Sequence, residues 1–291
     1  MSTHLLIDVS CLAWRSFHAM GDLSYGGVET GVTYGVFRTV LDLMDVYGTS
    51  SVAWCFDRGH DKRTVIYPDY KKNRKQPDRE PEELEARADL HRQIYRLRTK
   101  YLPGVGFKNI FWQDDYEADD VIASICQTLT KQQQAVIVSS DQDLYQLLTP
   151  RVSIWNPATQ KAITNESFRE KWSIDPFLWA DVKAIAGCGS DGVPGVVGVG
   201  EKTAIKHLCG QLKDTTKAYK SILSSNNLIR RNLRLVRLPM DGIERFELSD
   251  DEPSQEAWER VMDELGMRSL RGRRVSRVRK KVENQRSVWR A

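Results

Sequence analysis

Three short apolar runs mark the N-terminal half of the chain, at residues 4–10 (HLLIDVS), 50–57 (SSVAWCFD) and 134–141 (QAVIVSSD). Such runs are typical of strands buried on both faces of a parallel sheet. Between them, residues 34–48 (YGVFRTVLDLMDVYG) and 119–132 (DDVIASICQTLTKQ) have the pattern of helices. Alternating strands and helices predict an α/β fold with a mostly parallel central sheet and helices on both faces.

Each of the three predicted strands leads into an aspartate: Asp8, Asp57 and Asp141. In open α/β sheets the ligand crevice lies beyond the carboxyl ends of the strands. We therefore expect the three carboxylates to converge on one crevice.

Further acids gather in the segments DDYEADD and SSDQD. They are Glu117, Asp119, Asp120 and Asp143. Each cluster alone could be a helix cap, because acidic side chains favour a first helical turn. At one end of one sheet, however, so many carboxylates would repel one another unless cations lay among them. Oxygen ligands of this kind suit Mg²⁺ or Mn²⁺, and two such ions can clamp the attacking and leaving oxygens of a phosphoryl displacement.

Other chemistries fit the sequence less well. An aspartyl-phosphate enzyme would need a second Asp where Ser10 stands, a glycosidase needs only two carboxylates, and no G-x-S-x-G elbow is present. His60 and His91 fall in charged segments and are weak candidates for catalysis. The glycine-rich stretch 184–204 nearly forms a P-loop, but Glu201 occupies the position of the essential Lys. A metal-dependent phosphodiesterase accounts for the most residues.

Residues 58–102 are dense in Lys and Arg and include Tyr67, Tyr70, Tyr95 and Tyr101. Aromatic residues among cations suit a single nucleic-acid strand, because charges follow its backbone while rings stack on its bases. For the segment 67–75 (YPDYKKNRK) we expect phosphate contact. For the helix predicted over 82–102 a solvated, salt-bridged surface is favoured instead.

Composition narrows the class of protein and the cellular compartment in which we expect it. The 291 residues suffice for one large or two modest domains. Five scattered cysteines without a C-x-x-C pair argue against a zinc ribbon or a disulfide framework. No apolar run reaches the length of a membrane span, and the N-terminus does not resemble a signal peptide. These features predict a soluble cytoplasmic protein.

Charge is distributed unevenly along the chain. Residues 268–291 carry a net charge of +9, which leaves −5 for the rest of a chain whose net charge is +4. A basic tail on an acidic body suggests contact with a polyanion such as nucleic acid, although a solvated tail that aids solubility is the alternative. Helices are also predicted in 166–187, 226–239 and 254–267, with Trp172 and Trp179 as core residues rather than ligands.

The order and spacing of six motifs resemble the 5′-nuclease family. That family includes the 5′→3′ exonuclease domain of bacterial DNA polymerase I and phage flap endonucleases. The motifs are Asp8 after the first strand, FDRG, YPDYKKNRK, EADD, SSDQDLYQLL and GSDGVPGVVGVGEKTA, and the resemblance spans residues 4–240. It implies a PIN-like fold, a helical arch over about residues 62–102, and a helix-three-turn-helix that grips a DNA duplex.

The resemblance also implies an activity and its residues. The activity is magnesium-dependent hydrolysis at 5′ ends and 5′ flaps of branched DNA by two metal ions, with Mn²⁺ as a substitute, in replication or repair. Metal ligands, of which the first five also count as catalytic, would be Asp8, Asp57, Glu117, Asp119, Asp120, Asp141, Asp143 and Asp191. Arch cations that contact the scissile phosphate would be Lys71 and Arg74. DNA contacts would come from Tyr70, Lys71, Lys72, Arg74, Gly195, Gly198, Gly200, Lys202 and Thr203, and K⁺ could bind carbonyl groups of the glycine-rich loop.

One motif departs from the family pattern. Relatives have GDxSDN where this chain has GCGSDG, so Cys188 replaces an Asp and Gly192 replaces an Asn. A thiol is a poor partner for Mg²⁺, and we expect a weakened second metal site that prefers Mn²⁺.

The predicted organisation has three parts: an α/β nuclease domain (1–175), a helical DNA-binding region (176–267) and the basic tail (268–291). A monomer that acts on 5′ ends, flaps or branches is expected. Two rivals are a module that binds branched DNA without cutting it and a related ribonuclease. A chelator test separates the first from a nuclease, and matched DNA and RNA flaps separate the second.

Overall fold

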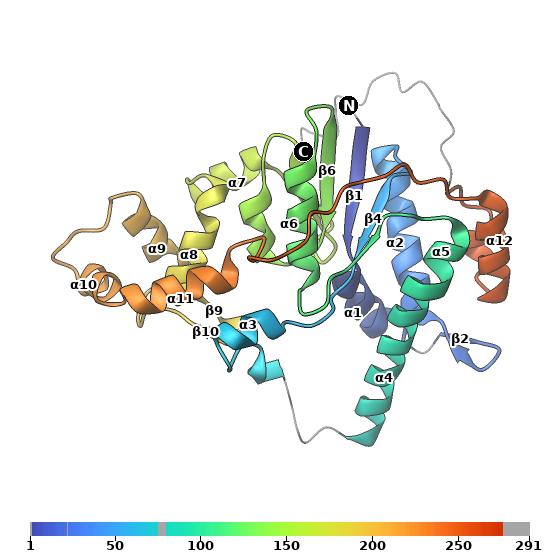
Figure 1. Cartoon of the computed structure of the whole chain (residues 1–291), viewed down its shortest axis with the longest axis horizontal. Helices are drawn as coiled ribbons and strands as arrows, with labels where there is room; N and C mark the ends of the chain where they lie inside the picture. Colours follow the sequence, from blue (N-terminus) through green and yellow to red (C-terminus); the bar gives the residue numbers. More distant parts are fainter. Residues whose placement is uncertain (1, 22, 75–79, 276–291) are drawn as a thin grey trace.

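The computed structural model describes residues 2–21, 23–74 and 80–275 (Figure 1). Its core is a six-stranded sheet. In spatial order the strands are β5 (Ile110–Phe111), β4 (Val52–Cys55), β1 (Ser2–Asp8), β6 (Gln133–Val138), β7 (Val152–Asn156) and β8 (Lys161–Ile163). All neighbouring pairs are parallel except β7 and β8. The mostly parallel sheet predicted from the apolar runs is confirmed.

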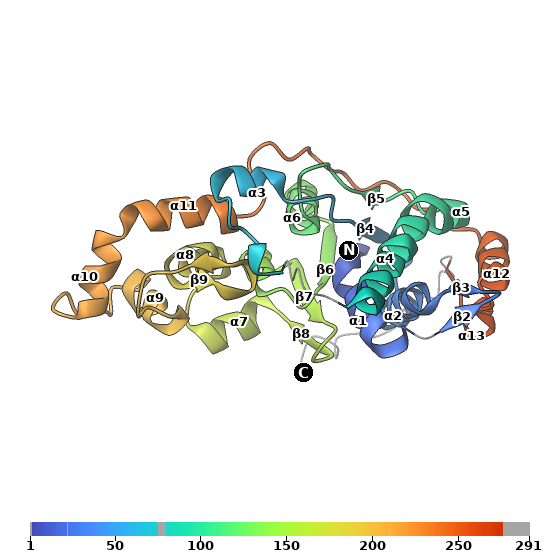
Figure 2. The ribbon, with the colours of Figure 1, turned by 90° about the horizontal axis from the view of Figure 1, so that it is seen from below.

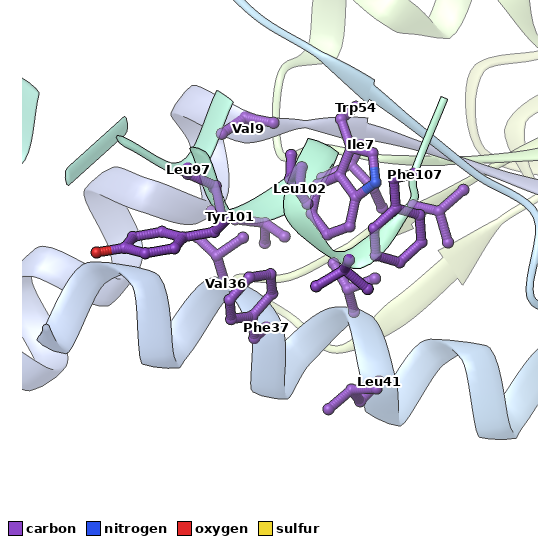
Figure 3. Close-up of a cluster of buried hydrophobic side chains, with 14 of the residues drawn as sticks. Ile7, Val9, Val36, Phe37, Leu41, Trp54, Leu97, Tyr101, Leu102 and Phe107 are labelled. Atoms are coloured by element: carbon purple, nitrogen blue, oxygen red, sulfur yellow. The ribbon is translucent and has the colours of Figure 1, made fainter. Parts of the chain in front are cut away.

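Helices cover both faces of the sheet, because alternate residues of β1 point to opposite sides. Leu5 and Ile7 enter one apolar core and Leu6 enters the other. The first core is closed by α1 (Val9–Met20) and α2 (Gly31–Tyr47). Figure 3 shows Phe37 of α2 beside the strand residues Ile7 and Trp54 in this core.

The second core lies under α6 (Ala118–Thr128), α7 (Asn165–Trp172) and α8 (Trp179–Ala186). Trp179 is completely buried there, and Trp172 packs against it with ring centres 4.8 Å apart. Both tryptophans therefore serve packing, as predicted.

The basic segment between β4 and β5 forms an excursion from the sheet. It contains α3 (Asp61–Ile66), a 3₁₀ turn (Lys72–Arg74), α4 (Pro81–Arg96), a π turn (Leu97–Tyr101) and α5 (Leu102–Val105). Figure 1 shows α4 projecting beyond the carboxyl end of the sheet. Part of the predicted arch, residues 75–79, lies outside the described residues.

The helices after α8 extend to one side of the sheet (Figure 2). They are α9 (Glu201–Leu208), α10 (Lys217–Ser224) and α11 (Asn226–Val236), and a short hairpin of β9 (Gly187–Cys188) and β10 (Val193–Pro194) joins α8 to this group. Helix α11 packs along α8, because the buried Asn232 side chain donates to the carbonyl oxygens of Ala184 and Pro194.

The chain then returns to the α/β core. The sequence had instead predicted that the helical DNA-binding region continues to residue 267. Residues 237–254 cross α6, where Ser124 Oγ donates to the Glu244 carbonyl at 2.7 Å. Helix α12 (Gln255–Glu264) follows and buries Trp258 against Phe37, with ring centres 4.9 Å apart. The apolar side of α12 is thus part of the first core and not of the helical DNA-binding region.

The beginning of the predicted basic tail is also folded. Helix α13 (Arg268–Arg271) packs on α12, and Arg273 pairs with Asp42 and Asp45 of α2 at 2.8 and 2.7 Å. The remainder of the tail, residues 276–291, lies outside the described residues. None of the described helices is long and apolar enough to cross a membrane.

Candidate active site

A cavity of about 900 Å³ opens at the carboxyl edge of the sheet, beside the base of α4. Its acidic lining residues come from the ends of β1, β4 and β6 and from the start of α6. They are Asp8, Asp57, Glu117, Asp119, Asp141 and Asp143. The cations Lys71, Arg74 and Lys183 line the same cavity. The convergence expected from the strand ends is therefore present.

Backbone N–H groups hold several of these carboxylates in place. Asp8 accepts from the Cys11 N–H at 2.9 Å and caps α1, while Asp141 accepts from the Asp143 N–H at 2.8 Å. Asp57 accepts from the N–H of Ala118 at 2.7 Å. A carboxylate can therefore cap a backbone N–H and still serve the cavity, because a carboxylate with one oxygen on a backbone donor keeps lone pairs for a second partner.

Burial and mutual repulsion make four of the acids hard to ionise, Asp8, Asp119, Asp141 and Asp143. Burial, and then the neighbouring Asp57, raises the pKa of Asp8 to about 7. Burial and the nearby Asp141 raise the pKa of Asp143 to about 7 and that of Asp119 well above its usual value. Carboxyl groups in this state gain strongly from a cation.

These pKa shifts predict how the stability of the metal-free protein depends on pH. Between about pH 4 and pH 7 the folded protein retains protons on Asp8 and Asp143 that the unfolded chain has lost. The unfolding free energy therefore falls as pH rises across that window, by on the order of several kcal/mol. Thermal unfolding in chelator at a series of pH values measures this, with Asp143→Asn expected to flatten the slope. A metal-free protein that gains stability over this window contradicts the prediction.

A second group of ligand atoms lies at the far side of the cavity. Asp143, Cys188 and Asp191 each offer an atom, and these atoms lie within 4.8 Å of one another. Asp143 Oδ1 is buried without a hydrogen-bond partner among the described residues, and Lys183 Nζ is 3.7 Å away. A buried oxygen left unsatisfied costs free energy, and a divalent cation would satisfy it. The donor set therefore fits a metal ion.

Cys188 is the unusual member of this group. Its side chain is buried and its Sγ lies 3.1 Å from Ser190 Oγ. Burial and the adjacent Asp143 raise the pKa of the thiol to about 12, so the sulfur is a neutral, soft neighbour for a hard cation.

Two cationic side chains that precede α4 contact carboxylates of the site. Lys71 Nζ donates to Glu117 and lies 3.7 Å from Asp191 Oδ1, and Arg74 Nη2 donates to the same Asp191 oxygen at 2.6 Å. Tyr70 is only 4% exposed and donates its hydroxyl to Glu117 at 3.0 Å. Tyr70 was expected to contact DNA, but the structure buries its ring, so its role here is to hold Glu117. Lys72 is exposed and pairs with Asp69 at 3.1 Å.

The structure does not bring Asp120 into the cavity. Both of its oxygens accept from Arg63 of α3, at 2.6 and 3.0 Å, and Oδ1 also accepts from the Met240 N–H at 2.9 Å. Asp120 is fully buried in this pair and also accepts from the Glu117 N–H at 3.3 Å. Its oxygens are occupied by structural partners, so the capping alternative describes Asp120 better than the metal-ligand expectation.

The glycine-rich segment between α8 and α9 contains the β9–β10 hairpin and then a loop that leads to α9, and its glycines differ in how tightly they are packed. A Cβ on Gly195 would lie 2.0 Å from the Ala186 carbonyl oxygen, so glycine is required there by packing. Gly198 has a φ of 76°, and Gly198 and Gly200 have open space where a Cβ would lie. Lys202 is exposed at the start of α9, and the Thr203 N–H donates a hydrogen bond to the Gly200 carbonyl oxygen. The tip of the loop between β10 and α9, at Gly198 and Gly200, is therefore open to solvent, whereas Gly195 is required by packing.

Two residues of the site carried no usable sequence signal. Arg63 is one basic residue among many in its segment, and its burial against Asp120 depends on tertiary packing. Lys183 sits within an ordinary helical pattern, and its Nζ bridges Asp143 and Glu201 at 3.7 and 3.1 Å. His91, a weak catalytic candidate, lines the cavity, while the His60 ring packs on Tyr70 with ring centres 5.7 Å apart.

A parallel sheet whose carboxyl edge holds an acidic cavity beside a basic helical excursion agrees with the PIN-like fold and acidic site that the motifs predicted for the class of 5′ nucleases. Within that class the chain belongs to the 5′-3′ exonuclease family: the model of the 5′-3′ exonuclease N-terminal resolvase-like domain matches residues 3–173. The chain is thus a nuclease, as its motifs predicted.

Individual relatives agree with this assignment. The chain is 30% identical to a 5′-3′ exonuclease of Aquifex aeolicus over 93% of its own length and 94% of that protein. It is 32% identical to a 5′-3′ exonuclease of Bacillus subtilis, over 69% of this chain and 68% of that one. DNA polymerase I of Thermus thermophilus is 32% identical over 81% of this chain, which spans 28% of the polymerase.

Solved structures show the same fold. T5 5′-exonuclease with bound zinc superposes with a TM-score of 0.71 and 24% identity, over 81% of this chain and 90% of that one. The T5 flap endonuclease in a complex with DNA and metal ions gives a TM-score of 0.69 at 21% identity, over 91% and 96% of the two chains.

Proposed function

We propose that this nuclease hydrolyses phosphodiester bonds at 5′ ends and 5′ flaps of branched DNA, with two Mg²⁺ ions, in DNA replication or repair. The observation that carries the proposal is the convergence of buried carboxylates in one cavity, where Asp143 Oδ1 accepts no hydrogen bond from a described residue. Such a site is suited to divalent cations and, through them, to phosphate.

The carboxylates divide into two groups under this proposal. Asp8, Asp57, Glu117 and Asp119 would hold one ion, and Asp141, Asp143 and Asp191 the other. The chemistry that bound ions supply is activation of water and polarisation of the scissile phosphate. Asp120 supports the first group indirectly, through its bond to the Glu117 N–H.

Lys71 and Arg74 would neutralise the charge that grows on the phosphate. Both now donate to carboxylates of the site, so their cationic groups already lie within reach of the reacting region. Preorganised cations at a developing charge are worth several kcal/mol in a water-poor site.

The loop between β10 and α9, with its tip at Gly198 and Gly200, and the residues Lys202 and Thr203 at the start of α9 would contact the backbone of the duplex, with K⁺ held by carbonyl groups of the loop. Backbone contacts of this kind position DNA without reading its sequence. The exposed tip and the open space beside Gly198 and Gly200 support this part of the proposal. A cytoplasmic monomer is proposed as the working form.

The test is cleavage of a 5′-labelled flap duplex during titration with Mg²⁺ and then Mn²⁺. We expect cuts near the junction, with a higher concentration requirement for Mg²⁺ than for Mn²⁺, because the Cys188 thiol is a poor ligand for a hard ion. Cys188→Asp should lower the Mg²⁺ requirement at least about tenfold, since it restores a carboxylate beside Asp143 and Asp191.

Cys188→Ser is the matched control, because it removes the sulfur without adding charge and should leave the Mg²⁺ requirement close to that of the wild type. Tight flap binding without products in either metal would support instead a protein that only binds branched DNA. Equal cleavage of a matched RNA flap would support the ribonuclease alternative.

A further inference from the structure

Cys188 brings a sulfur atom into the acidic site. It ends the short strand β9, while Asp143 and Asp191 stand in two 3₁₀ turns, Gln142–Leu147 and Gly189–Asp191. The tertiary structure places one ligand atom of each residue within 4.8 Å of the other two, and no other group of three potential ligands is as compact among the described residues. One thiol and two carboxylates therefore form a single donor set.

The Asp143 side chain gives an independent indication that a cation belongs in this group. It is only 8% exposed, and its Oδ1 accepts no hydrogen bond from a described residue. Lys183 Nζ, at 3.7 Å, lies beyond hydrogen-bond distance of that oxygen. A buried oxygen in this state costs free energy, and an ion bound to it would recover that cost.

One ion can reach all three residues. Zinc bonds of about 2.3 Å to sulfur and about 2.0–2.2 Å to carboxylate oxygen bridge separations of up to about 4.5 Å. A slight contraction of the group therefore brings the three ligand atoms to one ion. Three protein ligands and one open position are the usual composition of a zinc site that also meets a substrate.

The charges around the group favour a soft ion over a hard one. Asp191 Oδ1 already accepts from Arg74 Nη2 at 2.6 Å and lies 3.7 Å from Lys71 Nζ, and Lys183 lies beside Asp143. Mg²⁺ is held to oxygen by charge, so these cations weaken its attraction to the carboxylates. A thiolate bond to Zn²⁺ depends more on the softness of sulfur, and thiolates favour zinc over magnesium.

The surroundings of the sulfur are apolar. Cys188 is 5% exposed and packs in a cluster that contains Ala184, Val193, Leu235 and Val236. Mg²⁺ usually keeps several water ligands in a protein, whereas a zinc site needs as few as one, so an apolar wall disfavours Mg²⁺ more. The alternative is that Cys188 serves only as a small apolar residue of this cluster.

We propose that Cys188, Asp143 and Asp191, here called the Cys188 site, bind a thiophilic divalent cation such as Zn²⁺, with Cys188 bound as the thiolate. The thiol proton passes to the solvent when the bond between sulfur and metal forms. The inference rests on the proposed function and deepens it, because it names the class of ion that the second group of carboxylates takes.

The first test detects the bond between metal and sulfur directly, without DNA. Co²⁺ is titrated into the full metal-free chain, because a thiolate bound to Co²⁺ gives a charge-transfer band in the near ultraviolet that oxygen ligands do not give. We expect this band in the wild type and its loss in Cys188→Ser. Addition of Zn²⁺ should displace Co²⁺ and abolish the band.

Two other thiols provide matched controls. Cys11 lines the same cavity, with its Sγ 3.2 Å from Ser140 Oγ, and Cys209 is exposed. Cys11→Ser and Cys209→Ser should keep the band, because neither sulfur belongs to the Cys188 site. Thermal unfolding in chelator verifies that every variant is folded. Absence of the band from the folded wild type, or its persistence in Cys188→Ser, overturns the proposal.

The second test measures selectivity and affinity. A hundredfold excess of Mg²⁺, on the order that softness of the ligand predicts, should leave the cobalt band in place. Competition with a fluorescent zinc chelator should show that Cys188→Ser and Asp143→Asn each bind Zn²⁺ at least about tenfold more weakly, because each variant lacks one direct ligand. An unchanged Zn²⁺ affinity in Cys188→Ser would place the ion elsewhere and overturn the proposal.

Flap cleavage separates this inference from the proposed function. If the wild type cleaves a 5′ flap in Mg²⁺ but forms no band that depends on Cys188, the inference fails and the proposed function stands. If the band depends on Cys188 but neither Mg²⁺ nor Mn²⁺ supports cleavage, the proposed function fails and the Cys188 site stands.

Discussion

Asp119→Asn is expected to lower the rate of cleavage about a thousandfold and, at the same time, to make the metal-free protein more stable. The Asp119 side chain makes no hydrogen bond to another described residue, and burial together with Asp141 and Asp8 raises its pKa well above the usual value. Its charge is therefore a cost to the folded chain that only a cation can offset. Removal of that charge relieves repulsion, but it also removes a ligand from the site.

The size of the expected loss in kcat follows from the free energy by which a bound divalent ion stabilises the transition state of phosphoryl displacement. A loss of about 4 kcal/mol corresponds to a roughly thousandfold lower kcat with Mg²⁺. Flap cleavage under single-turnover conditions measures the first effect, and thermal unfolding in chelator at about pH 8 measures the second. An Asp119→Asn protein that cleaves at the wild-type rate would remove Asp119 from the proposed ligands.

Asp120→Asn changes the adjacent residue and is expected to make the protein less stable, the opposite of the effect of Asp119→Asn. Asp120 is fully buried and neutralises Arg63, whose side chain is 3% exposed. The substitution leaves the guanidinium buried, with Glu117, at 3.6 Å, as its remaining carboxylate partner among the described residues. Breaking a buried pair in this way costs about 3–5 kcal/mol. Chemical denaturation followed by circular dichroism measures the loss.

A double variant distinguishes lost pairing from lost packing. Arg63→Met with Asp120→Leu replaces the pair by apolar groups of similar size, and it should recover much of the loss, because buried pairs contribute little net stability over a well-packed apolar replacement. Recovery should be incomplete, since Arg63 Nε also donates to the Leu235 carbonyl at 2.9 Å. An Asp120→Asn protein as stable as the wild type would show that this pair does not hold α3 to α6.

The contrast between Asp119 and Asp120 marks the limit of what the sequence could predict. Both stand in one acidic run in the first turn of α6, and neither the apolar pattern nor the charge of the sequence distinguishes them. Helical geometry separates them, because neighbouring residues point about 100° apart. Asp119 then faces the cavity, and Asp120 pairs with Arg63, which is distant in the chain.

A similar limit applies to the basic segment. Its aromatic residues and cations suggested single-strand contact near Tyr70, yet that ring is buried against Glu117. The far part of the segment was expected to be a solvated, salt-bridged helix, and α4 does carry ion pairs between Arg87 and Glu83 and between Arg92 and Glu85. The ring of Tyr95 on this helix is 59% exposed. Which aromatic side chain stays exposed depends on what packs over it, and composition does not record that.

The sequence by itself determined the sheet, the edge at which the acids gather and the family. These follow from local periodicity and from the rule that parallel strands end at the same edge, neither of which needs distant contacts. The tertiary structure alone decided the partner of each acid, the burial of Asp143 Oδ1 without a hydrogen bond from a described residue, and the return of α12 to the first core. Those features depend on contacts between residues far apart in the chain, so they exist only once the chain has packed.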